Sequence, residues 1–386
     1  MIGRFRTIQR LVESTANPVR LDLTDAVPAM KAVVTTGVGG LERLEYRDVP
    51  LPIAQEGEVL LRVLAAGVNM TDINTRLGWY ARPVNLGTPS LAASPQASAP
   101  TTDEGWHGTM RFPIIQGADC CGRVVHVGKG VERHLLGRRV LVRPCMRPHG
   151  FASLETVWMG SDFDGAFAEF VKVPATEVFT VESDLTDAEL GVIPTAYGTA
   201  ENMLRRAGVT RGQHVVITGA SGGVGSAAVQ LAKLRGAVVT AITGGEKAEQ
   251  VRALGADHVV ERGVSLSEAI GEFAVDAVID NVSGPSLDQL IAVLKRGGKY
   301  VSSGAVAGPL VTFDKRVFYL RDLTFIGCTA WDKPVFGEVV SAVESGEVRP
   351  HVAGVFPLAR IADAQTELLT QRHVGKFAVV PGAADG

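Results

Sequence analysis

Hydrophobic and polar residues follow two different patterns along the chain, and the change falls near Thr186. Before Thr186, short apolar runs are separated by turn residues such as Gly37, Gly39–Gly40 and Pro50–Pro52, which is typical of strands joined by tight turns. We predict strands over residues 31–35, 58–66, 123–127, 139–143 and 166–173. This pattern indicates a compact, barrel-like β domain.

After Thr186, strands and helices alternate. Residues 214–218 are a continuous apolar run, as in a parallel strand covered on both faces. Residues 224–235 have the apolar spacing of a helix, and a second helix over 246–254 ends at Gly255. Further strands are predicted over residues 238–242, 259–260, 277–280, 300–302 and 324–326. The alternation predicts an α/β fold with a doubly wound parallel sheet.

The tail returns to the strand pattern from Val352, and its last strand is predicted over residues 376–380. We therefore expect the β domain to be built from both ends of the chain. The predicted division is an N-terminal extension 1–29, a β-rich domain 30–185 completed by 332–386, and a parallel-sheet domain 186–331.

Three segments fit neither pattern. Residues 81–111 hold four prolines among Ala, Ser and Thr, which predicts a long surface loop or lid, not a strand. Residues 144–164 are a second insertion, and either insertion shapes a pocket or only decorates the surface. Residues 1–29 begin with the basic MIGRFRTIQR, but three acidic residues follow, so we interpret them as a structural extension of a cytosolic protein, not a transit peptide.

Composition narrows the classes of function. With 46% hydrophobic residues, 20% charged residues and a net charge of -3, the chain gives no electrostatic reason to expect a nucleic acid or an anionic membrane as partner. No apolar run approaches the roughly 20 residues that span a bilayer. The four cysteines show neither a disulfide framework nor a CxxC pair, which favours reduced, buried thiols in the cytosol.

The segment HVVITGASGGVGSAAVQLAK reads as a strand, a glycine-rich turn and a helix, the context that a dinucleotide-binding turn needs. Gly222 and Gly223 lack the Cβ atoms that would block a pyrophosphate, and Gly225 lets the helix pack closely on the strand. Backbone N–H groups at the helix start would face the phosphates, so we expect contacts from Ala220, Ser221, Gly222, Gly223 and Val224. A tight turn without a ligand is the alternative.

The end of the second parallel strand favours NADP(H) over NAD(H). An NAD site needs an acidic residue there, but Ile242 occupies that position. Thr243 and Gly244 leave room for a phosphate, and Lys247 can supply its counter-charge. Glu246 is evidence against NADP(H), unless its role is only to place an acidic side chain at the N-terminus of the helix.

The order of motifs resembles a known family. MKAVV, EVLLRVLAAGVNMTD, PIIQGADCCGRVVHVGKGV, GAFAEFVKVP, PTAYGTA, GASGGVG and LGADHV follow one another as in the medium-chain dehydrogenase/reductase superfamily, over residues 30–381. Within it the chain is similar to the zinc-independent quinone oxidoreductase-like branch. The resemblance implies a GroES-like catalytic domain, a Rossmann domain and a cleft between them.

The resemblance also locates where zinc-dependent relatives hold their metal. Their ligand positions correspond here to Asn69, Ala118 and Gly191, none of which binds zinc strongly, and the cysteine-rich structural zinc lobe is missing. We therefore expect no metal. Without a Lewis acid, simple alcohols are hard to oxidise, whereas hydride transfer to a quinone or an α,β-unsaturated carbonyl stays feasible.

The resemblance suggests catalytic candidates at Asn69, Thr71 and Tyr80. The amide of Asn69 could donate to a substrate oxygen or hold a loop, and Thr71 could relay protons or cap a helix. Tyr80 could donate a proton or line the cleft, and Asp119, in place of a glutamate, is expected to be structural. Further cofactor contacts implied by position are Thr195, Tyr197, Asn281, Val282, Gly304, Ala305, Cys328, Thr329 and Lys376.

Two other functions stay open. An enoyl-thioester reductase for acyl-CoA substrates would need a basic patch, for which the candidates are Arg138, Arg139, Arg143 and Arg147. A cofactor-binding scaffold without turnover is the alternative from another class. The family also implies a homodimer, with residues 322–328 as a plausible edge strand.

Overall fold

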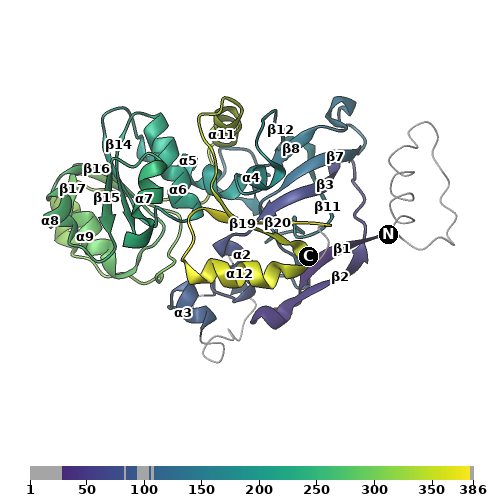
Figure 1. The fold of residues 1–386 in the computed structure, drawn as a ribbon, viewed down its shortest axis with the longest axis horizontal. Helices are drawn as coiled ribbons and strands as arrows, with labels where there is room; N and C mark the ends of the chain where they lie inside the picture. The colour runs from purple at the N-terminus through teal and green to yellow at the C-terminus, as the bar shows by residue number, and fades with distance from the viewer. Residues whose placement is uncertain (1–27, 82–83, 94–103, 106–107, 383–386) are drawn as a thin grey trace.

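The protein is described by a computed structural model that covers residues 28–81, 84–93, 104–105 and 108–382. Most of the predicted extension, residues 1–27, lies outside the described residues. A parallel sheet with its helices occupies one end of the molecule and a β-rich part the other, and the C-terminal segment runs between them (Figure 1). The predicted α/β fold is confirmed.

The parallel sheet has six strands in the order β15-β14-β13-β16-β17-β18, all of them parallel. Their bounds are β13 (His214–Ile217), β14 (Val238–Thr243), β15 (His258–Glu261), β16 (Val275–Asp280), β17 (Leu294–Ser302) and β18 (Thr324–Gly327). The chain order reverses between β13 and β16, and in such sheets a ligand binds outside the carboxyl ends of the strands at this point.

Helices cover both faces of this sheet, and its central strands are mostly apolar and buried. One core packs α5 (Pro194–Ala207), α6 (Gly223–Leu234), α7 (Ala248–Ala253) and α11 (Val335–Glu344). The other face carries α8 (Leu266–Ile270), α9 (Leu287–Ala292) and α10 (Lys315–Leu320). Trp331 is fully buried against α5, where a side chain at Gly198 would collide with its ring.

The β-rich part centres on a seven-stranded sheet of order β12-β8-β7-β3-β20-β19, with β11 also paired to β3. The bounds are β3 (Glu58–Gly67), β7 (Cys121–Val127), β8 (Arg139–Val142), β11 (Phe170–Pro174), β12 (Val178–Thr180), β19 (Val352–Pro357) and β20 (Lys376–Val380). A three-stranded sheet joins β1 (Ala29–Thr35), β2 (Leu44–Pro50) and β6 (Ile114–Ile115). The last strand, β20, pairs antiparallel with β3, so the two ends of the chain share one sheet.

Short helices complete this part at its contact with the parallel sheet. They are α2 (Met70–Arg76), α3 (Thr88–Ala92), α4 (Asp187–Gly191) and α12 (Ile361–Thr370). The apolar faces of α2 and α12 pack into the core beneath the β3 and β20 strands, through residues such as Ile73, Ile361 and Leu368.

The predicted insertions hold more regular structure than their sequences indicated. Within 81–111 the described residues contain α3 and a short hairpin of β4 (Glu104–Gly105) and β5 (Gly108–Thr109), so the prediction of a loop without strands was wrong there. Residues 144–164 contain β9 (Cys145–Met146) and β10 (Val157–Trp158), and Trp158 meets Trp331 edge-on at 5.5 Å between ring centroids. This second insertion therefore packs on the core. Among the described helices, none has both the length and the apolar character to cross a bilayer.

Candidate active site

The glycine-rich turn between β13 and α6 has the geometry that its sequence predicts. Gly219 adopts a left-handed φ of 57°. A Cβ at Gly225 would overlap the carbonyl oxygen of Gly219, so only glycine lets the helix begin this close to the strand. At Gly222 the nearest atom to an added Cβ is Gly219 O at 3.4 Å, and Gly222 lines the cavity at the start of α6. The turn can therefore accept a large anionic group.

A cavity of about 450 Å³ opens at this turn and is lined by both parts of the molecule. Nine of the predicted site residues line it: Asn69, Ser221, Gly222, Gly223, Val224, Lys247, Asn281, Val282 and Lys376. The structure thus brings residues from β14, β16, β20 and the loop after β3 to one place.

The buried carboxylate of Asp280 explains why Asn281 and Val282 reach the cavity. It accepts hydrogen bonds from the hydroxyls of Thr218 and Tyr300, each at 2.5 Å. It also accepts from the backbone N–H of Val282 at 2.9 Å. These bonds fix the turn after β16 at the carboxyl edge of the sheet.

Nine other predicted cofactor-binding residues do not line the cavity. Ala220 is fully buried beneath the turn, and the Tyr197 hydroxyl accepts from Gln230 at 2.9 Å, so Ala196 lines the cavity in its place. The Thr195 hydroxyl has no partner among the described residues. After β17 the lining residues are Val306 and Ala307, two positions beyond the predicted pair. Outside the lining are Thr195, Tyr197, Ala220, Thr243, Gly244, Gly304, Ala305, Cys328 and Thr329.

A buried polar cluster lies beside the turn, at the end of the Lys376 side chain. The Lys376 ammonium is ion-paired with Asp119 and donates to Asn69 Oδ1 at 2.7 Å. Asn69 Nδ2 donates to Asp119 Oδ2 at 3.0 Å and to the carbonyl of Gly67 at 3.3 Å. Both amide hydrogens of Asn69 are therefore engaged within the protein. Asp119 also accepts from the backbone N–H of Thr195 at 2.6 Å, which agrees with the structural role expected of it.

The backbone around Lys376 is pinned from three sides. Gly375 N–H donates to Ser221 O at 2.8 Å, and Lys376 N–H donates to His351 O at 3.0 Å. The Lys376 stem passes directly over Gly223, where an added Cβ would lie 2.6 Å from Cδ. The strand β20 thus carries its lysine to a fixed place between the glycine-rich turn and Asn69.

Thr71 and Tyr80 are brought together but do not line the cavity. Their hydroxyl oxygens are 2.9 Å apart, and burial raises the pKa of Tyr80. Asp72, behind them at the start of α2, accepts from the backbone N–H of Asn69 at 2.8 Å. Burial raises the pKa of Asp72 to about 7.

Three cationic or titratable side chains gather at the end of β14. Lys247 is buried, and its ammonium donates to the carbonyl of Gln371 at 2.6 Å. Arg262 and His373 line the cavity beside it, and burial and Lys247 lower the pKa of His373 to about 4. The Thr243 hydroxyl and His373 Nδ1 are buried with no hydrogen-bond partner among the described residues. Glu246, which in the sequence is evidence against NADP(H), is 72% exposed.

Sequence reasoning missed Arg262, His373 and the residues of α3 that line the cavity. Gly87, Pro89 and Ser90 reach it because Thr88 N–H donates to Val306 O at 3.0 Å. For this described part of the insertion, the structure favours pocket shaping over surface decoration. A signal for Arg262 existed, since it follows β15, the strand beside β14, and its N–H donates to Thr243 O at 2.8 Å.

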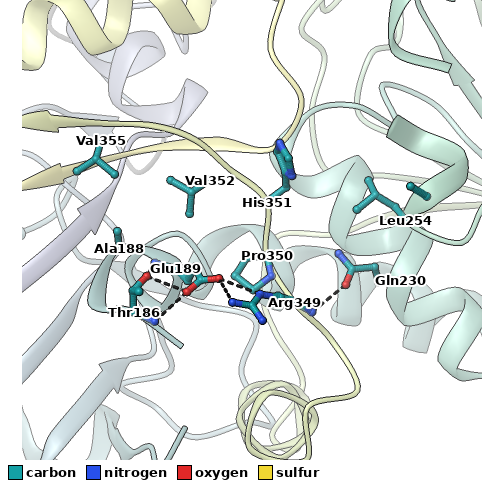
Figure 2. Close-up of a pocket in the computed structure, with 11 residues that line it drawn as sticks. Thr186, Ala188, Glu189, Gln230, Leu254, Arg349, Pro350, His351, Val352 and Val355 are labelled. Carbon is teal, nitrogen blue, oxygen red and sulfur yellow. Dashed lines mark hydrogen bonds and ion pairs between the residues drawn. The ribbon is translucent and has the colours of Figure 1, made fainter. Parts of the chain in front are cut away.

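A larger hollow of about 740 Å³ lies elsewhere and contains none of the predicted site residues. In it Glu189 lies between Thr186 and Arg349, and the Arg349 backbone bonds to Gln230 (Figure 2). Its polar groups already satisfy one another, and we assign it no chemistry.

Comparison with known proteins agrees with this geometry. Residues 55–183 match the model of the alcohol dehydrogenase GroES-like domain, and residues 223–345 match that of the zinc-binding dehydrogenase. Acryloyl-coenzyme A reductase of Metallosphaera sedula is 30% identical over 90% of this chain and 98% of its own length. The chain belongs to the medium-chain dehydrogenase/reductase superfamily.

Other members of the superfamily carry different names. NADPH-dependent alkenal/one oxidoreductase of Arabidopsis thaliana is 28% identical over 98% of this chain and 86% of its own length. A solved structure from Sinorhizobium meliloti 1021, provisionally named an alcohol dehydrogenase, is 39% identical with a TM-score of 0.83, over 93% of this chain and 98% of its own. Membership in the superfamily shows that the protein is an oxidoreductase. Its specific activity has to be inferred from the chemistry of the site.

The zinc of some superfamily members does not fit the residues present. Among the described residues, no three His, Cys, Asp or Glu side chains are grouped to hold a metal. At the ligand positions, Ala118 is apolar, Asn69 is bonded to Lys376, and a side chain at Gly191 would lie 2.8 Å from Ala65 Cβ.

The four candidate arginines for coenzyme A are engaged in structural contacts. Arg143 and Glu177 form a buried pair at 2.6 Å, and Arg147 donates to the carbonyl of Trp331 at 2.6 Å. Arg138 pairs with Glu182, and Arg139 binds the carbonyl of Leu185. They do not form a free basic patch.

Proposed function

We propose that this protein is an NADPH-dependent reductase that transfers hydride, without zinc, to a quinone or an α,β-unsaturated carbonyl compound. The observation that carries the proposal is the shared cavity, in which the glycine-rich turn faces Asn69 and no strong metal ligand stands at the former ligand positions. Without a metal ion as Lewis acid, the pKa of a bound alcohol would be lowered less, whereas an activated acceptor needs only orientation and a polar site for developing charge.

The residues present fit a dinucleotide with a 2′-phosphate. The cavity at Gly222 and the N-terminus of α6 suit a pyrophosphate. Lys247 and Arg262, which line the cavity at the end of β14, suit a second phosphate there, and His373 lies beside them. An exposed Glu246 leaves this end free of a buried acid that would repel the phosphate.

When bound, NADPH supplies the hydride, and the protein supplies position and electrostatics. The turn after β16 and the loop at Val306 and Ala307 hold one side of the cavity, while Val68, Asn69 and Met70 hold the other. Gly87, Pro89 and Ser90, at and before the start of α3, add a further wall to the cavity.

The names of two relatives support a carbonyl acceptor with a carbon–carbon double bond, since they refer to acryloyl-coenzyme A and to an alkenal/one. The free acceptor is our choice over the thioester, because the four candidate arginines are already bonded within the protein.

The four buried, free cysteines support a reducing compartment such as the cytosol, where we place the enzyme. Burial raises the pKa of the Cys145 thiol to about 12, so this cysteine would stay protonated and inert.

The test is NADPH oxidation by the full chain with a benzoquinone, an enone and crotonyl-coenzyme A side by side, and NADP⁺ reduction with a primary alcohol. We expect turnover with the quinone or the enone, unchanged by a chelator, and no stoichiometric zinc on metal analysis. Alcohol oxidation dependent on one bound zinc per chain would overturn the proposal. Turnover with crotonyl-coenzyme A alone would assign the enoyl-thioester reductase. NADPH binding without turnover would favour the scaffold.

A further inference from the structure

The residues that line the cavity follow the order of the strands in the parallel sheet. Arg262 comes directly after β15, the edge strand, and Lys247 follows β14 beside it. The glycine-rich turn after β13 comes next, then Asn281 after β16 and Val306 after β17. The cavity therefore runs along the carboxyl edge of the sheet, from two cationic side chains at one end to the loop after β17 at the other.

This order gives the proposed cofactor a direction. With the 2′-phosphate at Lys247 and Arg262 and the pyrophosphate at the glycine-rich turn, the rest of an extended dinucleotide continues toward β16 and β17. The nicotinamide then lies at the end of the cavity beside the loop after β17. The acceptor has to lie against the nicotinamide, because hydride transfer needs the two reacting carbons about 3–3.5 Å apart.

The segment Gly87–Ser90 of the β-rich part meets the loop after β17 at this end. Thr88 N–H donates to Val306 O at 3.0 Å, and the Thr88 hydroxyl donates to Asn74 Oδ1 at 2.7 Å, so the segment is tied to both parts of the molecule. Met70, at the start of α2, lines the same cavity. We propose that the acceptor binds between Met70 and the segment Gly87–Ser90. This inference deepens the proposed function and rests on it.

The chemistry of these walls defines the class of acceptor. The residues around this end are uncharged and mostly apolar: Met70, Gly87, Pro89, Ser90, Val306 and Ala307. Lys247 and Arg262 lie at the other end, and the ammonium of Lys376 is ion-paired with buried Asp119. Burying a charge without a partner costs far more than burying a neutral group. The acceptor is therefore an uncharged enal or enone with an apolar substituent, and Met70 and Ser90 are specificity-determining residues.

The reaction to be followed is the two-electron reduction of a carbon–carbon double bond. The β-carbon of the enal accepts hydride and gains a C–H bond, while the C=C electron pair moves toward the carbonyl group. A proton from water then forms the C–H bond at the α-carbon. NADPH is oxidised to NADP⁺, so the loss of NADPH absorbance measures turnover of every enal in the same way.

The first test compares two enals of similar size, 4-methylcinnamaldehyde and 4-carboxycinnamaldehyde, of which the second carries a negative charge. In the wild type, kcat/KM should be lower for the carboxylate by about tenfold or more, because its charge has no partner in the site. Ser90→Arg should raise the ratio of the carboxylate to the methyl compound by about tenfold or more, since a guanidinium pairs with a carboxylate. Losses in folding cancel in this ratio, because both substrates meet the same preparation.

The matched control for Ser90→Arg is Ser341→Arg, at an exposed position of α11 that does not line the cavity. It adds the same charge to the protein elsewhere. Its ratio of kcat/KM for the carboxylate and the methyl compound should equal that of the wild type.

The second test shortens Met70. Met70→Ala should raise the ratio of kcat/KM for 3-(2-naphthyl)acrolein to that for cinnamaldehyde by about fivefold or more, because the removed side chain leaves room for the second ring. Met110→Ala, at a residue that does not line the cavity, is the matched control and should keep the wild-type ratio.

Three results would overturn the inference and leave the proposed function standing. They are an unchanged ratio in Ser90→Arg or in Met70→Ala, a wild type that prefers the carboxylate, and a wild type that reduces a benzoquinone but no enal. A wild type that reduces neither a benzoquinone nor any enal would remove the proposed function and the inference together.

Discussion

Lys247 is the residue on which the choice between NADPH and NADH depends most directly. Its ammonium is buried with the carbonyl of Gln371 as hydrogen-bond partner, and burial lowers its pKa, so a nearby phosphate would be strongly favoured. We expect Lys247→Ala and Arg262→Ala each to raise the KM for NADPH by about 10- to 100-fold, the equivalent of a charge-assisted hydrogen bond. The KM for NADH should change less than about threefold, measured by steady-state kinetics with one acceptor.

The surface lysine Lys129, 84% exposed and paired with Glu56, offers the matched control. Lys129→Ala should leave both KM values unchanged. Equal losses for NADPH and NADH in the Lys247 variant would mean that it acts through Gln371 and the fold, and the argument for NADPH would fail.

Asp72 makes a second prediction, about pH and stability. Its ordinary pKa is 3.8, and burial raises it to about 7 in the fold. Between these values the native state holds a proton that the unfolded chain has lost, so the free energy of unfolding falls as pH rises from 3.8 to 7. Asp72→Asn keeps an oxygen for the backbone N–H of Asn69 but carries no charge. We expect a higher Tm than wild type at about pH 8 and a smaller Tm difference between about pH 5 and pH 8.

Thermal unfolding in a buffer series checks this. Asp322→Asn removes an exposed carboxylate and should leave the pH dependence of Tm as it is in the wild type. An unchanged Tm difference in Asp72→Asn would show that Asp72 is ionised in the fold at all these pH values.

Site residues that belong to one short segment could be predicted from the sequence. Site residues that only the order of the strands brings together could not. Gly222, Gly223 and Gly225 belong to one turn, so their spacing alone locates them. Arg262 and His373 reach the same cavity from the end of β15 and from the C-terminal tail; the place of Arg262 after a parallel strand was a signal, whereas nothing in the sequence around His373 marks it. Lys376 was located by resemblance, but its bonds to Asn69 and Asp119 required the structure.

At the scale of elements, the close contact between the start of α3 and the loop after β17 predicts the effect of a substitution. Gly87 precedes it, and a Cβ there would lie 2.6 Å from Val306 O and 2.8 Å from the carbonyl carbon of Ala307. Backbone atoms cannot move away cheaply, so we expect Gly87→Ala to lower the free energy of unfolding by roughly 1–3 kcal/mol. It should also raise the KM of the acceptor, because α3 forms one wall of the cavity.

Urea unfolding and acceptor kinetics measure the two effects. Gly37→Ala is the matched control, since an added Cβ there meets nothing within 4 Å and the backbone is not left-handed. A Gly87→Ala protein with the stability and KM of Gly37→Ala would show that the gap between α3 and the loop after β17 is not tight.

Elements with a strong hydrophobic period were predicted closely, and polar or short ones were missed. β13, α6 and β20 lie within a residue of their predicted bounds, because apolar runs and glycine turns delimit them. β2 was missed because its residues are mostly exposed, and β4, β5 and α3 because prolines dominate their surroundings. β2 pairs with β1, and this pairing leaves no pattern in the local sequence.

At the scale of the whole molecule, the order of the elements predicted the domain arrangement better than any single element did. Alternating strands and helices, enclosed by β pattern on both sides, indicated an inserted parallel-sheet domain. The pairing of β20 with β3 joins the chain's two ends in one sheet. That pairing is also what brings Lys376 to Asn69, so the long-range topology creates the active-site cluster.

The same topology leaves β18 at the edge of the parallel sheet, and we predict that two copies pair there. Nearby apolar side chains are unusually exposed, with Leu310 at 71%, Tyr319 at 57% and Leu320 at 56%. An unpaired strand edge beside such a patch is a site for a second copy. Light scattering after size-exclusion chromatography should give about twice the chain mass of 40.7 kDa. Leu320→Glu should shift the protein toward the monomer by burying a charge at the interface.

The control is Leu154, which is 78% exposed. It lies in the insertion over residues 144–164. Leu154→Glu should leave the mass unchanged, because the predicted interface lies at β18 and not at this insertion. A monomeric wild type would refute the dimer. If Leu154→Glu dissociated the protein and Leu320→Glu did not, the interface would lie over residues 144–164. In that case the β18 edge would need another explanation for its exposed apolar side chains.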